Sequence, residues 1–313
     1  MNILVTGGAG FIGSHLCDAL LARGDTVICV DNFNDYYSPA RKKKNVGSNR
    51  DNVRFKLYSI DLKDAKKLKE IFVHEHVDCI VHLAAKAGVR HSIMFPQQFQ
   101  EDNNKATMNL LEMAKSFNVK KFIFGSSSSI YGNRSEVPFR ETDSVDTPIS
   151  PYAATKKSCE LMIHTYSHLY DFSAICLRFF TVYGPRGRPD MAPFKFTDLV
   201  YSEKPITKYG DGSTARDYTY CTDIVSGIVG AIDVQGLQYE VINLGNSSPV
   251  TLNEFISTVE KHVGKVAKII PAGVPKGDVQ VTFADISKAQ KLLGYQPQVS
   301  FDEGIRRLVE WYK

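Results

Sequence analysis

The chain has 313 residues, of which 43% are hydrophobic and 23% are charged, and its formal net charge is +4. This composition is ordinary for a soluble globular protein, and a chain of this length can bury a core without a metal or disulfide staple. The six cysteines are far apart and form no Cys-x-x-Cys pair, which excludes a zinc-site spacing and a disulfide framework and is typical of a reducing cytoplasm.

The chain also lacks the signals of secretion and membrane insertion. Met1 leads directly into an expected strand without a basic leader, and no long apolar run follows. The densest positive charge, Arg41–Lys44, is interpreted as a solvated loop rather than a nucleic-acid contact. We therefore expect a cytoplasmic protein with no membrane span, no metal site and no nucleic-acid partner.

Short β-branched runs alternate with amphipathic stretches through the first half of the chain, which predicts a parallel sheet covered by helices on both faces. The expected strands are Asn2–Thr6, Thr26–Asp31, Val53–Tyr58, Cys79–Leu83, Lys121–Gly125 and Ser173–Arg178. The expected helices are Phe11–Arg23, Ala65–His74, Pro96–Phe117 and Pro151–Tyr170. The predicted fold class is α/β, with a doubly wound parallel sheet of the Rossmann type.

The residue pattern of the chain changes after about Phe180, where Gly, Pro and polar residues repeatedly interrupt the apolar runs. We interpret residues 1–178 as a dinucleotide-binding domain and residues 179–313 as a smaller mixed α/β lobe that binds the substrate. Val241–Leu244 has the composition of one more strand that returns to the large sheet.

A glycine-rich turn joins the first expected strand to the first expected helix. Gly7, Gly10 and Gly13 would let backbone N–H groups approach a pyrophosphate at the helix N-terminus. Asp31 and Asn32 end the second expected strand, where an acidic side chain accepts the hydroxyls of an adenosine ribose and repels a 2′-phosphate. The pattern predicts bound NAD rather than NADP.

Tyr152 and Lys156 lie one helical turn apart on the expected helix Pro151–Tyr170, so the ammonium can favour the ionised phenol. A base that works at neutral pH needs the tyrosine pKa lowered by roughly three units from ~10. The lysine and a positive nicotinamide ring can supply that shift. Together with the glycine turn, the pair predicts a hydride-transfer site in which Tyr152 is the base and then the acid.

With Gly-x-x-Gly-x-x-Gly at residues 7–13 and Tyr-x-x-x-Lys at 152–156, the chain resembles the extended short-chain dehydrogenase/reductase family over nearly its whole length. The resemblance implies that Ser127 completes a catalytic triad with Tyr152 and Lys156. It also implies an adenine contact after the third strand, a contact of Lys86 with the nicotinamide ribose, and a helix start at Asp102–Asn104. The implied cofactor residues are Phe11, Ile12, Asp61, Leu62, Leu83, Ala84, Ala85, Lys86, Asn103 and Ser126.

The residues that follow Ser127 bear on what happens after oxidation. Members of the family that dehydrate or decarboxylate a sugar carry a carboxylate within the next two positions, whereas this chain has Ser128 and Ser129. The resemblance therefore implies epimerisation, in which the hydride returns to the opposite face of the ketone and no cofactor is consumed.

The second half is similar to the UDP-glucuronate 4-epimerases, at Phe179–Met191 and Arg216–Tyr220, as is Ala87–Arg90 before it. A guanidinium fork suits a carboxylate because it gives two charge-assisted hydrogen bonds. The similarity implies that the C6 carboxylate is held by Thr181, Arg188 and Ser128, with Arg90 nearby, and that the nucleotide pyrophosphate and ribose are held by Arg216 and Asp278.

The resemblance also implies a homodimer through Pro96–Phe117 and Pro151–Tyr170, which carry more apolar residues than one sheet face needs. Three other functions stay open. The chain could be a UDP-glucose or UDP-N-acetylglucosamine 4-epimerase, a UDP-glucuronate decarboxylase, or a non-catalytic NAD-sensing or RNA-associated protein of the same fold. Arg188 and Thr181 argue against the first, and Ser128 and Ser129 against the second. The intact triad and the absence of a sustained basic face argue against the third.

Overall fold

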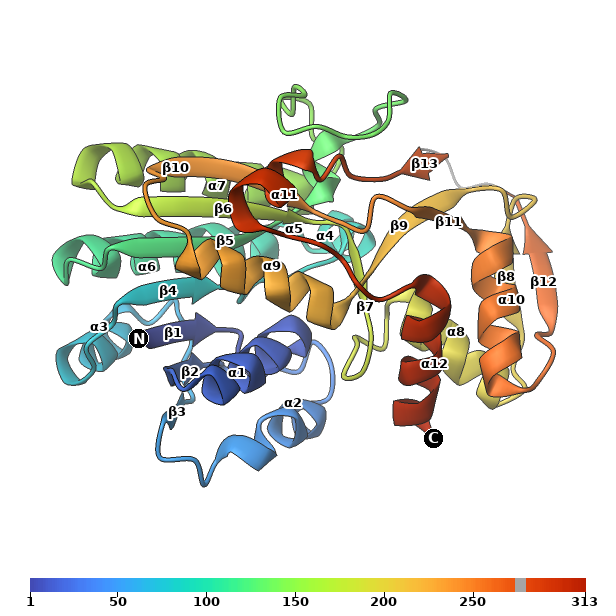
Figure 1. The fold of residues 1–313 in the computed structure, drawn as a ribbon, viewed down its shortest axis with the longest axis horizontal. Coiled ribbons are helices and arrows are strands. Elements are labelled where there is room, and N and C mark those ends of the chain that lie inside the picture. Colours follow the sequence, from blue (N-terminus) through green and yellow to red (C-terminus); the bar gives the residue numbers. More distant parts are fainter. Residues whose placement is uncertain (274–279) are drawn as a thin grey trace.

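A seven-stranded parallel sheet forms the larger part of the molecule in the computed structural model, which describes residues 1–273 and 280–313 (Figure 1). The strand order is β10-β6-β5-β4-β1-β2-β3. The α/β class with a doubly wound parallel sheet is thus confirmed, and the expected strand at 241–244 belongs to the sheet. The strands are β1 (Asn2–Thr6), β2 (Thr26–Val30), β3 (Phe55–Tyr58), β4 (Cys79–His82), β5 (Lys121–Ser127), β6 (Ser173–Phe179) and β10 (Tyr239–Leu244).

Hydrophobic clusters cover both faces of this sheet, and successive side chains along a strand point alternately into one cluster and the other. In β1, Ile3 and Val5 belong to one hydrophobic cluster and Leu4 to the other. All three side chains are fully buried. A strand buried on both faces is apolar throughout rather than at every second position, which is why the strands of this chain read as continuous apolar runs.

Helices from both halves of the chain pack on the sheet. One face is covered by α1 (Phe11–Arg23) and α9 (Cys221–Asp233), and the other by α3 (Ala65–His74), α6 (Ala106–Ser116) and α7 (Pro151–Tyr170). The start of α7 is specified locally, because the Ser150 hydroxyl accepts a hydrogen bond from the Ala153 N–H at 3.1 Å and Pro151 occupies the first turn. This start places Tyr152 in the first turn and Lys156 one turn later.

The expected helix Pro96–Phe117 is helical from Pro96 to Ser116, but it is not α-helical throughout. It consists of α5 (Pro96–Phe99), a π-helical segment (Gln100–Lys105) and α6. Asn103 therefore lies inside the π segment and not at a helix start. Such bulges are often found at functional sites, and the apolar periodicity did not reveal this one.

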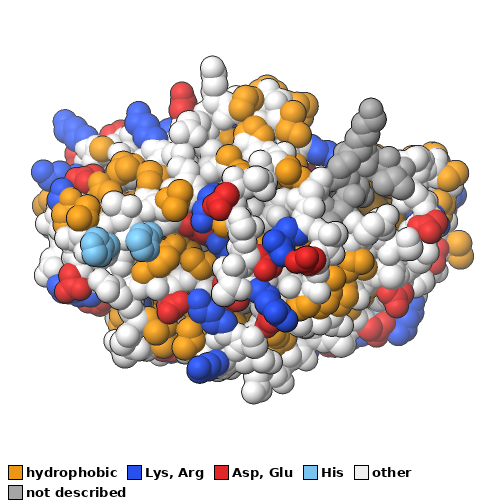
Figure 2. All heavy atoms as spheres, turned by 90° about the horizontal axis from the view of Figure 1, so that it is seen from above, with side chains coloured by type: hydrophobic (Ala, Val, Ile, Leu, Met, Phe, Trp, Pro, Cys, Tyr) orange, Lys and Arg blue, Asp and Glu red, His pale blue; other side chains and the backbone are white. Residues whose placement is uncertain are grey.

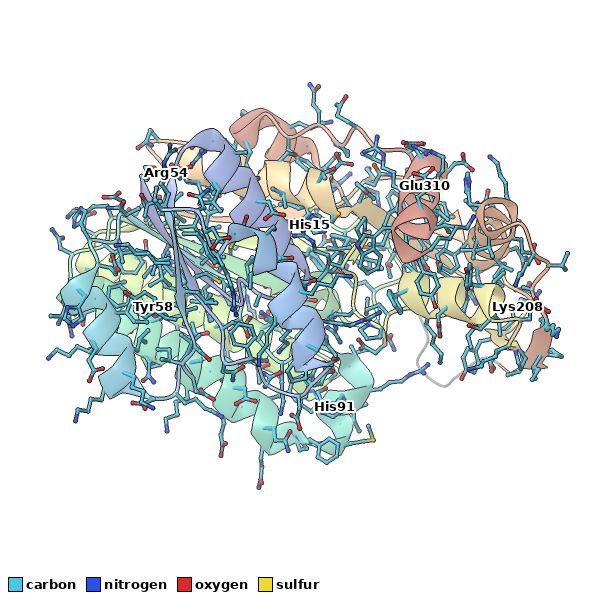
Figure 3. The ribbon with its side chains drawn as sticks, turned by 90° about the horizontal axis from the view of Figure 1, so that it is seen from below. His15, Arg54, Tyr58, His91, Lys208 and Glu310 are labelled. Carbon is cyan, nitrogen blue, oxygen red and sulfur yellow. The ribbon has the colours of Figure 1, made fainter. Side chains whose placement is uncertain are left out.

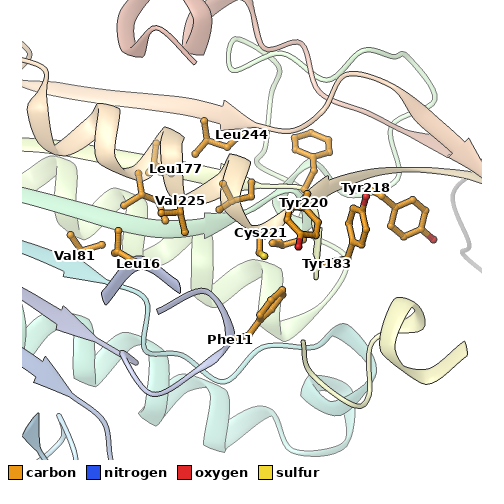
Figure 4. Close-up of a cluster of buried hydrophobic side chains, with 14 of the residues drawn as sticks. Phe11, Leu16, Val81, Leu177, Tyr183, Tyr218, Tyr220, Cys221, Val225 and Leu244 are labelled. Carbon is orange, nitrogen blue, oxygen red and sulfur yellow. The ribbon is translucent and has the colours of Figure 1, made fainter. Parts of the chain in front are cut away.

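The remaining elements form a smaller lobe, at the right of Figure 1. The core of the large sheet continues into it: beyond Cys221 and Val225 of α9 lie Tyr183, Tyr218 and Tyr220 (Figure 4). The strands of this lobe are β7 (Thr181–Tyr183), β8 (Ile206–Tyr209), β9 (Ala215–Tyr220), β11 (Pro249–Thr251), β12 (Ile269–Ala272) and β13 (Val281–Thr282), and its helices are α8 (Ala192–Tyr201), α10 (Leu252–Val263) and α12 (Phe301–Tyr312).

Short elements complete the chain: α2 (Pro39–Asn45), the 3₁₀ turns Gly47–Asn49 and Ser128–Tyr131, α4 (Val89–Met94) and α11 (Ser287–Leu293). The division into residues 1–178 and 179–313 stays a prediction. From the second range, β10 is a strand of the large sheet and α9 packs on one of its faces. In the part of the chain that the structure describes, no helix has the length and apolarity needed to cross a membrane. All six cysteines are buried free thiols.

Candidate active site

A cavity opens along the carboxyl ends of the parallel strands, with about 1240 Å³ of space that includes the part open to solvent. Ligands of open α/β sheets bind at this edge. Most of the expected cofactor residues line it: Gly7, Gly10, Phe11, Ile12, Gly13, Asp31, Asn32, Asp61, Leu62, Leu83, Ala84, Ala85, Lys86, Ser126, Tyr152 and Lys156. Residues from five different strand ends thus meet at one cavity.

The glycine turn between β1 and α1 leaves no room for side chains. A Cβ on Gly7 would lie 2.8 Å from the Ala84 nitrogen, and one on Gly13 would lie 2.2 Å from the Gly7 oxygen. The N-cap of α1 is Gly10, which provides no side-chain cap. The first N–H groups of α1 therefore remain available to an anion, and this cradle fits the pyrophosphate of a dinucleotide.

Asp31 lies just beyond β2 and is fixed by the backbone. Its carboxylate accepts hydrogen bonds from the N–H groups of Ala9 at 3.2 Å and Phe33 at 2.8 Å, and the Lys42 ammonium is 4.0 Å away. Burial raises the pKa of Asp31, and these three groups partly oppose the shift. An acceptor for ribose hydroxyls is thus held at the cavity, and a 2′-phosphate there would meet a carboxylate.

Lys42 corrects the interpretation of Arg41–Lys44 as a solvated loop. Its side chain is buried in the cavity wall, and its ammonium donates to the backbone oxygen of Asn34 at 3.0 Å and to the Asn34 Oδ1 at 2.8 Å. The Arg41 guanidinium lies 4.4 Å from the centroid of the ring of Phe194, a residue of α8. Only Lys43 and Lys44 of this run are exposed.

The expected triad is brought together by α7 and the end of β5. Tyr152, Lys156 and Ser127 are all buried. The Lys156 ammonium donates to the Gly125 carbonyl at 2.6 Å and lies 4.5 Å from the centroid of the Phe124 ring. Burial lowers the pKa of Lys156 to about 8. Lys156 is therefore held against β5, beside the cavity that Tyr152 also lines.

The pKa of Tyr152 differs from the sequence expectation. Burial raises it above the usual tyrosine value, and hydrogen bonding to Ser127 and the positive charge of Arg188 offset only part of the rise. The expected lowering by Lys156 is not seen, because the ammonium donates to Gly125 instead. The surrounding protein groups by themselves thus keep the phenol protonated.

A buried ion pair lies directly behind the triad. Glu160, one turn after Lys156 on α7, accepts from Arg178 of β6 at 3.0 and 2.9 Å and from the Ser126 hydroxyl at 2.6 Å. Ser127 in turn donates to the Ser129 hydroxyl at 3.1 Å. Sequence reasoning missed this pair, and its only local signal is an acidic residue on the same helical face as Lys156.

Asn103 does not line the cavity, but it shapes the loop that does. Its side chain accepts from the Lys86 N–H at 2.8 Å and donates to the Lys86 carbonyl at 3.1 Å and to the Thr155 hydroxyl at 3.0 Å. The Lys86 ammonium contacts Gln98 at 2.5 Å and Asp102 at 3.3 Å. The π segment therefore fixes the Lys86 loop against α7.

Arg188 lines the same cavity as Tyr152. The Nη2 amino group of Arg188 donates to the Ala87 carbonyl at 3.0 Å and to the Tyr36 hydroxyl at 3.5 Å. The same Nη2 and the Nε of Arg188 also donate to the Asp190 carboxylate, at 2.5 and 3.0 Å. Burial opposes the charge, but Asp190 raises the pKa of Arg188 above its usual value, so the guanidinium stays positive. The fork already holds one carboxylate, half exposed to solvent, in the geometry that such groups favour.

The other expected substrate residues differ in burial and in their position relative to the cavity. Thr181 opens β7 and Ser128 opens the turn after β5, and both are half-buried. Arg90 is exposed on α4, with its guanidinium 5.8 Å from the centroid of the Tyr209 ring in β8, and does not line the cavity. Arg216 of β9 donates to the Ala215 carbonyl at 2.9 Å. Asp278 lies outside the described residues.

Comparison with known proteins identifies relatives over the whole chain. Residues 4–308 match the family described as GDP-mannose 4,6 dehydratase. A protein of Thermodesulfobacterium geofontis named UDP-glucuronate 4-epimerase is 47% identical over 311 residues, which cover 99% of this chain and 95% of that protein. UDP-glucuronate 4-epimerase 1 of Arabidopsis thaliana is 42% identical, covering 100% of this chain and 76% of that protein.

Solved structures agree with these relatives. The UDP-glucuronic acid 4-epimerase of Bacillus cereus, in complex with UDP-glucuronic acid and NAD, has a TM-score of 0.91 at 38% identity and covers 99% of this chain and 98% of that one. A UDP-glucose 4-epimerase of Thermotoga maritima, solved with UDP-glucose, has a TM-score of 0.91 at 33% identity and covers 100% and 98%. This chain therefore belongs to the GDP-mannose 4,6-dehydratase family of extended short-chain dehydrogenases/reductases.

Proposed function

We propose that this protein is an NAD-dependent isomerase that epimerises C4 of UDP-glucuronate to give UDP-galacturonate. One observation carries the choice of a sugar acid: a guanidinium that stays positive lines the cavity of Tyr152, close enough for its charge to act on the tyrosine hydroxyl. The relatives named UDP-glucuronate 4-epimerase support the same choice.

The chain's own residues have separate tasks in this reaction. Bound NAD⁺ supplies the acceptor that takes the C4 hydride and later gives it back. Tyr152 takes the proton of the C4 hydroxyl, which leaves a 4-keto sugar, and returns it after the sugar has presented its other face. Ser127 hydrogen-bonds the same C4 oxygen and orients it. Lys156 holds the nicotinamide ribose.

Because burial raises the pKa of Tyr152, its action as a base would depend on positive charge around it. Ser127 and Arg188 offset part of the effect of burial on this pKa, and the positive charge of the nicotinamide ring would supply the remainder. We therefore expect proton transfer to Tyr152 only when the oxidised dinucleotide is present, which couples the base to the form of the cofactor that accepts the hydride.

The sugar acid must also be kept from losing CO₂. A uronate oxidised at C4 is a β-keto acid, which decarboxylates when its carboxylate lies perpendicular to the ketone plane. We assign the C6 carboxylate to Arg188, Thr181 and Ser128. A carboxylate held at several points cannot rotate freely, and Ser128 and Ser129 provide no acid to assist elimination.

We also propose that the protein works as a homodimer in the cytoplasm. On α7, Leu161 and Leu169 are 56% and 60% exposed, more than a helix packed only on its own sheet requires. Hydrophobic side chains gather in several patches on the face above the β10 edge (Figure 2). Light scattering that gave twice the mass of one chain would support the dimer, and the mass of one chain would contradict it.

The function is tested by incubating the purified protein with UDP-glucuronate, without added NAD, while NMR follows the anomeric protons of the sugar. We expect UDP-galacturonate to appear, which requires both C4 epimerisation and retained cofactor. Accumulation of UDP-pentose would instead identify a decarboxylase. Turnover of UDP-galactose or UDP-N-acetylglucosamine alone would contradict the assignment of Arg188 while leaving the redox site intact.

A further inference from the structure

Tyr37 carries a buried hydroxyl that the protein does not use. Within residues 1–273 and 280–313, only its Oη and the Arg134 Nε are buried side-chain polar atoms without a hydrogen-bond partner. Buried polar atoms are nearly always paired, because an unpaired one loses its bonds to water without replacement. An unpaired hydroxyl therefore calls for a partner that is not part of the chain.

The position of this hydroxyl indicates where that partner lies. Tyr37 follows β2 and lines the dinucleotide cavity. Its Oη is 3.8 Å from the point where a Cβ on Gly10 would stand, beside the uncapped start of α1. The Lys42 ammonium lies 5.0 Å from the centroid of its ring. The hydroxyl thus faces the uncapped start of α1, where free N–H groups favour an anion.

The neighbouring tyrosine provides a contrast. The Tyr36 hydroxyl donates to the Ala87 carbonyl at 2.6 Å, so it is satisfied by the protein itself. Burial and the charge of Asp31 raise the pKa of Tyr37 to about 12, so its hydroxyl remains a hydrogen-bond donor across the physiological pH range. A donor needs an acceptor, and a phosphate oxygen is a strong one.

We propose that the Tyr37 hydroxyl donates a hydrogen bond to a phosphate oxygen of the bound dinucleotide. The α1 N-terminus contacts the pyrophosphate from the glycine turn, and Tyr37 contacts it from the segment between β2 and α2. The inference concerns the dinucleotide site alone, and it holds whichever sugar nucleotide the enzyme epimerises.

Tyr37→Phe tests this by removing only the unpaired oxygen. We expect NAD to bind at least about tenfold more weakly, a change of about 1.4 kcal/mol, because a hydrogen bond to a charged acceptor is lost. The nucleotide-free protein should unfold at the same or a slightly higher temperature than wild type, because no protein contact is lost. The readouts are NAD retained after dialysis, NAD affinity by titration, and the unfolding midpoint with and without NAD.

Tyr58→Phe is the matched control. Tyr58 lies on the edge strand β3 and outside the cavity lining, and its hydroxyl donates to Glu75 at 2.7 Å (Figure 3). Its removal should lower the unfolding midpoint of the nucleotide-free protein slightly and leave NAD affinity unchanged. The two substitutions thus have opposite expected patterns.

Simpler ligands locate the contact on the dinucleotide. If Tyr37 binds a phosphate, Tyr37→Phe should weaken ADP as much as NAD and leave adenosine unaffected. Wild-type NAD affinity in Tyr37→Phe would overturn the proposal, and so would equal weakening of ADP and adenosine or a nucleotide-free midpoint that falls as in Tyr58→Phe. Epimerase activity decides none of these outcomes, so the proposed function and this contact can fail separately.

Discussion

The buried ion pair of Arg178 and Glu160 allows a quantitative test of how much a buried unpaired charge lowers the free energy of unfolding. The side chains of Arg178 and Glu160 are only 3% and 1% exposed, and Glu160 meets the guanidinium at two points. Glu160→Gln keeps the shape of the side chain but leaves the Arg178 charge buried without a counter-charge. Arginine cannot escape by losing its proton, so the free energy of unfolding should fall by about 3–5 kcal/mol.

Urea denaturation followed by circular dichroism measures this loss. The control is Glu203→Gln, which breaks the ion pair of Glu203 with Lys265. The two charged groups are 2.8 Å apart, and the side chains of Glu203 and Lys265 are 59% and 41% exposed. Water and ions already screen such a pair, so its removal should leave the midpoint almost unchanged.

A double substitution separates the lost attraction from the stranded charge. Glu160→Gln combined with Arg178→Met removes both charges and should recover much of the stability lost in the single variant. Equal midpoints for Glu160→Gln and Glu203→Gln would refute the reasoning. So would a double variant no more stable than Glu160→Gln alone.

Three further predictions concern the site and its surroundings. Tyr152→Phe should keep its NAD but lose a factor of about 10²–10⁴ in turnover, measured by NMR; turnover within threefold of wild type would remove Tyr152 from the role of base. Arg188→Ala should raise the UDP-pentose formed per turnover as well as weaken substrate binding, and weaker binding alone would show that Arg188 does not restrain decarboxylation. Burial lowers the pKa of His82 from 6.5 to about 3. Between these pH values His82 takes up a proton in the unfolded state but not in the folded state, so the free energy of unfolding falls as the pH drops from 6.5 toward 3. His82→Gln should remove about 2 kcal/mol of this loss between pH 7 and 5.

Local patterns were enough to predict the sheet and the helix that carries Tyr152 and Lys156. The helices over Phe11–Arg23, Ala65–His74 and Pro151–Tyr170 have the bounds expected from the sequence, because a glycine turn, an aspartate cap and a Ser-Pro start are each specified within a few residues. The spacing of Tyr152 and Lys156 needs only a helix to place both on one side.

The π segment within Pro96–Phe117 shows where local patterns fail. Gln100–Lys105 is polar throughout, so it carries no apolar periodicity that could distinguish a π turn from an α turn. What distinguishes it is the bonding of Asn103 to Lys86 and Thr155, residues from a strand end and from another helix. Only the folded chain brings these groups together.

The sequence by itself therefore determined the fold class, the position of the glycine turn and the spacing of Tyr152 and Lys156, because each depends on neighbours along the chain. The tertiary structure alone decided the electrostatics of the site. The pKa of Tyr152, the burial of Lys42 and the unpaired hydroxyl of Tyr37 depend on desolvation and on charges from distant segments. Electrostatic energies follow distance in space and exclusion of water, and neither quantity is set by position along the chain.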